Sequence, residues 1–273
     1  MNDIAVLISI YRNDNLDDLK ECINSLYNQS FKKFDIFVQE DGPVDENIDI
    51  FLTEELYSKR ISYLGKRESN IGFDFSLNEL LEITFKKGYK FFVRMDADDI
   101  AMSERIEQQF KFMDKHPNVD VVGTFIEEFS TEISFSKKLS YPLSHQDMRN
   151  FFKRRVPLAH VTAFFRKTFF DKAGFYETDG HLNNGDTLLW MKGFNNGCNF
   201  ANINYIGVKV RVSKEFFERR GGLKKAYCDF RNRIEVINTL NYSPLTIFFA
   251  IGSSLIILLP RRLKRLAYLY LRK

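Results

Sequence analysis

The stretch Tyr89–Met95 (YKFFVRM), which runs directly into Asp96–Asp99 (DADD), decides the fold class of this chain. Its first part has the pattern of an apolar strand, and its second part is an acidic turn at the carboxyl end of that strand. In open α/β sheets, ligands bind beyond the carboxyl ends of the strands. The stretch therefore predicts a buried strand that presents carboxylates to a binding site.

Strand-like and helix-like segments alternate on the N-terminal side of this stretch. The run Ile4–Ile10 (IAVLISI) is apolar throughout, as expected of a strand buried on both faces of a parallel sheet. Repeated β-α-β order with short connections predicts an α/β fold, doubly wound, with three α/β/α layers and a mostly parallel central sheet. Further strands are expected over 34–39 and 61–64, and helices over 14–28, 48–58 and 70–87.

The pattern beyond residue 100 is less regular. A helix is expected over 103–115, with Ser103 as its N-terminal cap. Strands are expected over 120–125 and 160–165, and further helices over 144–156, 166–173, 185–194 and 223–239.

The positive charge of the chain is concentrated at one end. The 273 residues include 40 Lys and Arg against 36 Asp and Glu, a formal net charge of +4. Six of the basic residues lie in 243–273, which has no acidic residue, so the 34 basic and 36 acidic residues of the rest carry a net charge of −2. A slightly acidic body argues against nucleic acid as a partner. Three cysteines without disulfide or zinc spacing favour a reducing cytosol.

Asp96 and Asp98 are the sharpest candidates for chemistry. Residues i and i+2 of an extended chain project to the same side, so their carboxylates are held close together. A divalent cation offsets the repulsion, and Mg²⁺ takes one or two carboxylates while substrate phosphates fill its other positions. The alternative is that both are ordinary turn residues, a role that Asp often has.

Two further acids follow or begin expected elements. Asp41, in the turn after the second strand, stands where an acid can accept hydrogen bonds from a nucleotide's base or ribose, and an ordinary β-turn is the alternative. Asp186 begins the helix that carries Trp190 one turn later. A carboxylate beside an aromatic ring suits a sugar site, whereas the alternative is a helix cap followed by a core tryptophan.

Six motifs in a fixed order lie between residues 4 and 222. They are VLISIYRND (6–14), QEDGP (39–43), NIGFDFSLN (70–78), RMDADD with the following RIEQQ (94–109), HVTAFFRKTFFDKAGFYET (160–178) and NGDTLLW (184–190). In this order they resemble glycosyltransferase family 2, the inverting nucleotide-sugar transferases with the GT-A fold. The branch that they resemble assembles bacterial surface polysaccharides such as O-antigen, capsule and exopolysaccharide.

The resemblance implies a donor site at matching positions. Asp41 would bond a uracil-type base, with the Tyr11 region forming its pocket, and Asn70 would join them in donor binding. Asp96 would approach the ribose or the metal, and Asp98 would coordinate Mn²⁺ or Mg²⁺ bridging the diphosphate.

The resemblance also implies the reacting groups. Asp186 would be the general base, and His160 and Trp190 would lie on the acceptor side. Apart from the resemblance, the basic residues Arg211, Arg219 and Arg220 could clamp the diphosphate, with a solvated basic surface as the alternative. A buried structural histidine is an equal alternative for His160. The chain departs from the family pattern where Glu40 replaces a frequent Asp, Leu77 a frequent Arg, and Gly185 the usual acid beside the base.

These features together predict a metal-dependent inverting glycosyltransferase that uses a nucleotide-sugar, with a UDP-sugar favoured, and a polyprenyl-diphosphate-linked saccharide acceptor. Residues 1–242 would form the catalytic domain, with a nucleotide-sugar half over about 1–100 and an acceptor half over about 101–242. A non-catalytic membrane-associated nucleotide-sugar-binding protein and a nucleotidyltransferase are the alternatives, although the Gly-rich N-terminal loop that the latter needs is missing.

Residues 243–273 form a hydrophobic and basic tail. The run Leu245–Leu259 has no charged residue, but it is shorter than the ~20 residues of a spanning helix. Basic and aromatic residues follow it, which favours a segment lying in the headgroup region of an anionic membrane. The sequence therefore predicts a peripheral, monotopic protein on the cytoplasmic face of the bacterial plasma membrane. A helix packed on the core and a tilted or re-entrant span are the alternatives.

Overall fold

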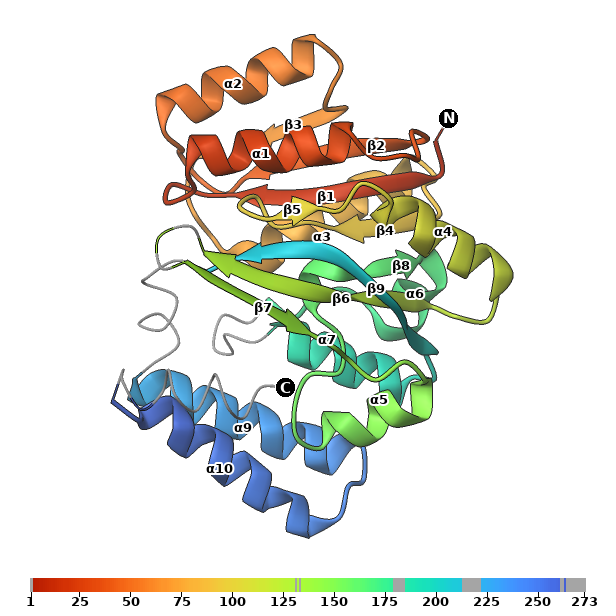
Figure 1. The fold of residues 1–273 in the computed structure, drawn as a ribbon, viewed down its shortest axis with the longest axis vertical. Coiled ribbons are helices and arrows are strands. Elements are labelled where there is room, and N and C mark those ends of the chain that lie inside the picture. The colour runs from red at the N-terminus through yellow and green to blue at the C-terminus, as the bar shows by residue number, and fades with distance from the viewer. Residues whose placement is uncertain are drawn as a thin grey trace.

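The computed structural model describes residues 2–130, 132, 134–178, 185–212, 222–260 and 263. In these residues one sheet of nine strands runs through the molecule, with helices on both faces and a helical pair at the C-terminal end (Figure 1). The strand order is β3-β2-β1-β4-β8-β6-β9-β5, and β7 pairs with β6. The strands are β1 (Ile4–Ile10), β2 (Phe34–Glu40), β3 (Tyr63–Lys66), β4 (Phe91–Arg94), β5 (Ile100–Ala101), β6 (Val121–Ser130), β7 (Phe135–Leu139), β8 (Phe164–Arg166) and β9 (Phe200–Arg211).

Every helix expected from the sequence is present, with ends that differ by a few residues. Helix α4 begins at Arg105, and its N-cap is Glu104 rather than the expected Ser103. The helices are α1 (Leu16–Tyr27), α2 (Glu46–Tyr57), α3 (Phe73–Lys86), α4 (Arg105–Lys115), α5 (His145–Phe152), α6 (Lys167–Ala173), α7 (Gly185–Asn195), α9 (Leu223–Thr239) and α10 (Ile247–Leu258), with short 3-10 helices η1 (His160–Thr162) and η2 (Pro244–Thr246).

The sheet is mixed. Strands β3, β2, β1 and β4 are parallel, because helical crossovers connect them in sequence. Strand β8 is antiparallel to both β4 and β6, and β9 is parallel to β6 but antiparallel to β5. The parallel arrangement expected for most of the sheet thus describes its first half, and the second half combines both directions.

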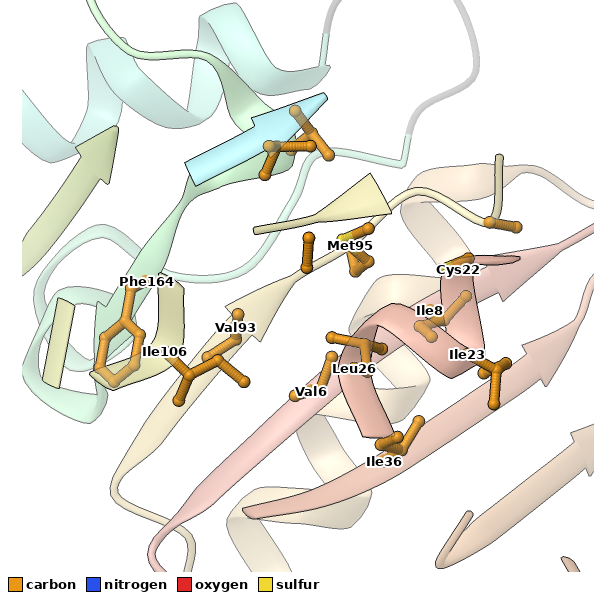
Figure 2. Close-up of a cluster of buried hydrophobic side chains, with 14 of the residues drawn as sticks. Val6, Ile8, Cys22, Ile23, Leu26, Ile36, Val93, Met95, Ile106 and Phe164 are labelled. Atoms are coloured by element: carbon orange, nitrogen blue, oxygen red, sulfur yellow. The ribbon is translucent and has the colours of Figure 1, made fainter. Parts of the chain in front are cut away.

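Apolar helix faces cover the first face of the sheet. Helix α1 begins where the Asn15 side chain accepts hydrogen bonds from two backbone N–H groups, and its buried positions recur at helical spacing. Figure 2 shows Cys22, Ile23 and Leu26 of α1 lying over Val6 and Ile8 of β1. Both faces of β1 are buried, as its continuous apolar run predicts.

The second face is covered by α3, α5, α6, α7 and α9, and its core is rich in aromatic rings. Trp190 of α7 is fully buried there and stacks on Phe165 of β8 at 5.7 Å between ring centroids. The two covered faces make the expected three α/β/α layers.

Strands β5, β7 and β9 lie outside the predicted elements. The segment expected as a strand over 160–165 begins as the 3-10 helix η1 before β8 starts at Phe164. Strand β9 ends at Arg211, beside the acidic turn after β4. The second half of the sheet thereby brings a basic side chain back to the carboxylates of the first half.

Helices α9 and α10 lie side by side below α5 and α7, on the far side from β1 (Figure 1). Ser253 of α10 donates a hydrogen bond of 2.9 Å to the Asp229 carboxylate of α9, and Ala250 is the buried residue of α10. Among the described residues, no helix has both the length and the apolarity that crossing a bilayer requires. The expected basic cluster of the tail lies outside the described residues, apart from Leu263 within it.

Candidate active site

The acidic turn after β4 is a tight group of charges. Arg94, which is buried at the end of β4, forms an ion pair with Asp96. Burial, followed by the charge of Asp96, raises the pKa of Asp98 to about 6. The same two influences raise the pKa of the buried Asp99 well above its usual value. The fold therefore holds several carboxylates in a place where their negative charges oppose one another.

This donor set fits a divalent cation. Carboxylate oxygens are the ligands that Mg²⁺ and Mn²⁺ prefer, and a cation would offset the repulsion that raises the pKa values of Asp98 and Asp99. In the described ranges, no group of three or more His, Cys, Asp or Glu side chains is arranged to hold a metal ion. Asp96 and Asp98 would thus supply a partial ligand set, as Mg²⁺ sites completed by substrate phosphates do.

A buried arginine of α4 holds this turn from behind. The Arg105 side chain is fully buried and donates hydrogen bonds to the backbone oxygens of Arg94 at 2.7 Å and Val161 at 2.8 Å. It also donates to the Gln109 side chain, which in turn donates to the backbone of Thr162 at 2.7 Å. Arg105 therefore connects β4 to the segment that carries His160, a role that only its place in the RIEQQ motif could have suggested.

Arg211 contacts the acidic turn from the other side. Its backbone N–H donates to Asp99 at 2.8 Å, and its Nε donates to the backbone oxygen of Asp98 at 3.0 Å. Its guanidinium also forms ion pairs with Asp18 and Glu21 of α1. The structure places Arg211 next to the predicted metal ligands, with its guanidinium engaged by acids of α1.

Asp41 is buried and ties two loops together. Its carboxylate forms an ion pair with Arg67 and accepts hydrogen bonds of 3.0 Å from the backbone N–H groups of Ile71 and Gly72. Asn70 donates to the backbone oxygen of Asp41, also at 3.0 Å. Both residues therefore join the end of β2 to the start of α3, and Asp41 uses both of its oxygens inside the protein.

Glu40, one residue earlier, differs from Asp41 because one of its buried carboxylate oxygens has no hydrogen-bond partner among the described residues. It ends β2 beside Ile10, the residue before Tyr11. Its carboxylate is buried, and in the part of the chain that the structure describes its Oε1 has no hydrogen-bond partner. Burial is the main cause that raises its pKa to about 7. Glu40 thus has a buried polar atom beside the predicted nucleotide-binding positions.

Asp186 lies in the first turn of α7 and accepts a hydrogen bond of 2.8 Å from the backbone N–H of Thr187. Its charge raises the pKa of Asp74, in the first turn of α3, to about 6, although burial is the larger cause. The Arg94 guanidinium opposes that shift. Asp186, Asp74 and Arg94 are thus close enough to interact, and the Arg94–Asp96 ion pair links them to the acidic turn.

His160 and Tyr176 lie at the same place. The ring Nε2 of His160 and the Tyr176 hydroxyl are 2.7 Å apart, and burial lowers the pKa of His160 well below its usual value. Tyr176 is held by a reciprocal pair of 2.9 Å hydrogen bonds between its backbone and the Asn78 side chain. His160 is therefore a neutral ring packed between α3 and α7, and the closing Asn78 of the NIGFDFSLN motif positions its partner.

The structure corrects the expectation for Trp190. Its side chain has 0% exposure and is covered by aromatic rings, so it offers no surface to a sugar. His160 lies against it at 5.9 Å between ring centroids. The aromatic character that suggested sugar stacking belongs to the core, where burial of a large ring is favourable.

The sequence of this chain matches a known family. The family model described as glycosyl transferase family 2 matches residues 5–174, more than half of the chain. This chain belongs to glycosyltransferase family 2. It is therefore a glycosyltransferase, and this assignment favours the predicted transferase over the nucleotidyltransferase and the non-catalytic binder.

Curated relatives cover most of the chain. The amylovoran biosynthesis glycosyltransferase AmsE of Erwinia amylovora is 31% identical over 218 residues, which are 80% of this chain and 79% of that protein. A UDP-Gal:alpha-D-GlcNAc-diphosphoundecaprenol beta-1,3-galactosyltransferase of Escherichia coli is 26% identical over 230 residues, 83% of this chain and 80% of that protein. These named relatives therefore support the predicted place of this chain in bacterial surface-polysaccharide biosynthesis.

Solved structures share the fold of this chain. S. aureus TarS 1–349 in complex with UDP-GlcNAc matches with a TM-score of 0.61 at 16% identity, covering 97% of this chain and 84% of that one. The complex of the same protein with UDP has a TM-score of 0.61 at 19% identity, covering 97% and 83%. The predicted GT-A fold of this family 2 enzyme is therefore confirmed.

Proposed function

We propose that this glycosyltransferase moves a sugar from a UDP-sugar to a lipid-linked saccharide, with inversion, in the biosynthesis of a bacterial surface polysaccharide. The observation that carries the proposal is the continuous set of charges from Asp186 through Asp74 and Arg94 to Asp96. This set of charges joins Asp186, an acid that can activate an acceptor hydroxyl, to the acidic turn, which can bind the diphosphate of a nucleotide. The name of the Escherichia coli relative, which specifies UDP-Gal and a diphosphoundecaprenol-linked sugar, supports both substrate classes.

In this proposal the site residues have separate roles in the transfer reaction. The Asp186 carboxylate accepts the proton of the acceptor hydroxyl while the hydroxyl oxygen forms the new bond to the anomeric carbon. The bond from that carbon to the diphosphate oxygen breaks on the opposite face, so a single displacement inverts the configuration. Asp96 and Asp98 would hold the cation, which when bound would offset the negative charge of the leaving nucleoside diphosphate. Arg105 keeps the acidic turn in place through its bonds to β4 and η1.

A donor screen tests the proposed activity directly. The purified full-length chain is incubated with Mn²⁺, a lipid-linked saccharide acceptor and a panel of nucleotide-sugars, and released nucleoside diphosphate is measured. We expect release with one or a few UDP-sugars, and stronger release when acceptor is present. Release from another nucleotide class alone would contradict the assignment of a UDP donor.

Removing the proposed metal ligand Asp98 should weaken metal-dependent nucleotide binding. In Asp98→Ala we expect the Mn²⁺-dependent affinity for UDP to fall at least about tenfold, because even outer partners of a metal site usually contribute that much. Calorimetric titration of UDP with and without Mn²⁺ measures the change. Asp114→Ala, an exposed acid near the far end of α4, is the control. An unchanged Mn²⁺ dependence in Asp98→Ala would exclude Asp98 as a ligand.

We also propose that the C-terminal region holds the enzyme on the cytoplasmic face of an anionic membrane, where a lipid-linked acceptor is found. The exposed side of α10 supports this proposal. Phe248 is 67% exposed and Leu255 59% exposed, and Leu245 just before the helix is 71% exposed. Exposed apolar side chains of this kind, followed in sequence by a basic cluster, suit an interfacial helix.

Vesicle flotation tests the membrane proposal. The full-length chain should float with vesicles that contain phosphatidylglycerol, and a 1–242 truncation should not. The variant Phe248→Asp with Leu255→Asp should also lose flotation, because charges on the exposed face oppose burial in the interface. Tyr57→Asp, on an 81% exposed aromatic of α2, is the matched control and should float normally. Equal flotation of the truncation and the full-length chain would contradict the proposal.

A further inference from the structure

Gly185 and Asp74 come from different helices and occupy adjoining space. A Cβ atom placed on Gly185 would lie 2.4 Å from Oδ2 and 2.6 Å from Oδ1 of Asp74. Real Cβ contacts are essentially never that short, so any side chain at position 185 would displace the Asp74 carboxylate. The glycine at the start of α7 thus leaves a space, and the carboxylate of an acid from α3 fills it.

This placement sets two carboxylates next to each other. Gly185 directly precedes Asp186, and the Asp186 charge contributes to raising the pKa of Asp74 to about 6, after the larger effect of burial. An acid in the first turn of a helix normally stabilises that helix through the macrodipole. Here the surroundings oppose the ionised form of Asp74, so helix stabilisation does not account for the acid at this position.

A buried arginine beside the pair has unused hydrogen-bonding capacity. Arg94 is 4% exposed, and in the described part of the chain its Nε and Nη1 have no hydrogen-bond partner. Its guanidinium lies 4.5 Å from the ring centroid of Phe73, the residue before Asp74, and its charge acts on Asp74. Buried polar groups are nearly always hydrogen-bonded, so these atoms point to a polar ligand at this place.

We infer that Asp74 is a second acceptor-binding carboxylate, which accepts a hydrogen bond from a hydroxyl adjacent to the one that Asp186 deprotonates. Two neighbouring carboxylates can each accept one hydroxyl, so the acceptor class is a sugar with two adjacent hydroxyl groups. Gly185 leaves room for the Asp74 carboxylate, and Arg94, whose charge acts on Asp74, has two N–H groups without a partner among the described residues. The inference rests on the proposed function, because Asp186 is its reference point.

Steady-state kinetics test the acceptor contact. The probes are a GlcNAc-diphospho-lipid acceptor and the UDP-sugars of the donor screen. In Asp74→Ala we expect the acceptor KM to rise roughly 10-fold to 100-fold, the loss typical of one hydrogen bond to a charged group. Adding Gly185→Asp to Asp74→Ala should restore part of the affinity for the acceptor. The Cβ atom of the new aspartate would lie where the Asp74 carboxylate lies in the wild type. Gly185→Asp alone should be impaired, because both carboxylates then compete for one space.

Thermal unfolding separates this role from a structural one. Folding raises the pKa of Asp74 to about 6, so ionised Asp74 lowers the free energy of unfolding. This loss of stability begins as the pH rises past the pKa of the unfolded chain and is complete above about pH 6. Asp74→Asn should therefore raise the Tm at pH 8 by roughly 2–4 °C. Glu46→Gln, an exposed first-turn acid of α2, is the matched control and should not raise it.

The outcomes are distinct. A lower Tm in Asp74→Asn together with an unchanged acceptor KM in Asp74→Ala would overturn the inference and make Asp74 a helix-stabilising acid. A folded double variant with no recovery of acceptor affinity would also count against it. If the wild type releases no nucleoside diphosphate from any donor with this acceptor, the proposed function fails and the inference fails with it.

Discussion

The variant Asp186→Asn is expected to lose transfer almost completely, with a fall in kcat of about 10²- to 10⁴-fold, the usual contribution of a general base. The amide keeps the size of the side chain but cannot take up the proton of an acceptor hydroxyl. Asp186 lies in the first turn of α7, next to Asp74, whereas the proposal assigns the diphosphate to the Asp96–Asp98 turn. UDP binding should therefore persist while the rate of UDP release collapses.

Two measurements decide this expectation. Released UDP gives the rate, and calorimetry with Mn²⁺ gives the nucleotide affinity of the same preparation. Asp171→Asn is the control, because Asp171 is a half-exposed acid of α6 that forms an ion pair with Lys167. Turnover of Asp186→Asn near that of the wild type would remove Asp186 from the mechanism and leave the reaction without its proposed base.

The variant Arg105→Leu is expected to cost about 3 kcal/mol of unfolding free energy, because it leaves several buried acceptors without a donor. The backbone oxygens of Arg94 and Val161 and the Gln109 side chain all accept from Arg105 in the wild type. Burial of the guanidinium lowers its pKa to about 9, so relief of that desolvation offsets part of the loss. Urea denaturation of wild type and variant measures the difference.

The consequences should reach the active site. Arg105 holds the backbone of Arg94 and of the segment before β8, so the variant should also bind UDP more weakly in the presence of Mn²⁺. Lys111→Leu, at an exposed position of the same helix, is the matched control and should change stability by less than about 0.5 kcal/mol. A loss below about 1 kcal/mol in Arg105→Leu would show that the network contributes little.

Local patterns accounted for the expected helices, for most of the strands and for the acidic turn. The run Ile4–Ile10 lies between two layers of helix because a strand with no polar face has to be buried on both sides. The turns after β2 and β4 lie at the same edge of the sheet, because β-α-β order makes these strands parallel and their carboxyl ends then meet at one edge. Short-range periodicity carries this information, so it is readable without coordinates.

The roles of residues that depend on burial could not be predicted from the sequence in this way. Trp190 and Asp186 share one helix in the sequence, but the first is sealed in the core and the second lies among the site charges. A helix presents different faces to different surroundings, and the chain alone does not tell which aromatic ring is covered. Strand β9 was missed for a related reason, because it is stabilised mainly by its pairing with β6, a contact between distant segments.

The sequence by itself determined that this chain is a family 2 glycosyltransferase with a GT-A fold, because ordered motifs and strand periodicity are local properties. The tertiary structure alone decided which side chains meet. It set Asp74 of α3 against Gly185 of α7, and it turned Arg105 into the support of the acidic turn. Such pairings join residues far apart in the chain, and only the folding of the sheet and its two helical layers brings them within contact distance.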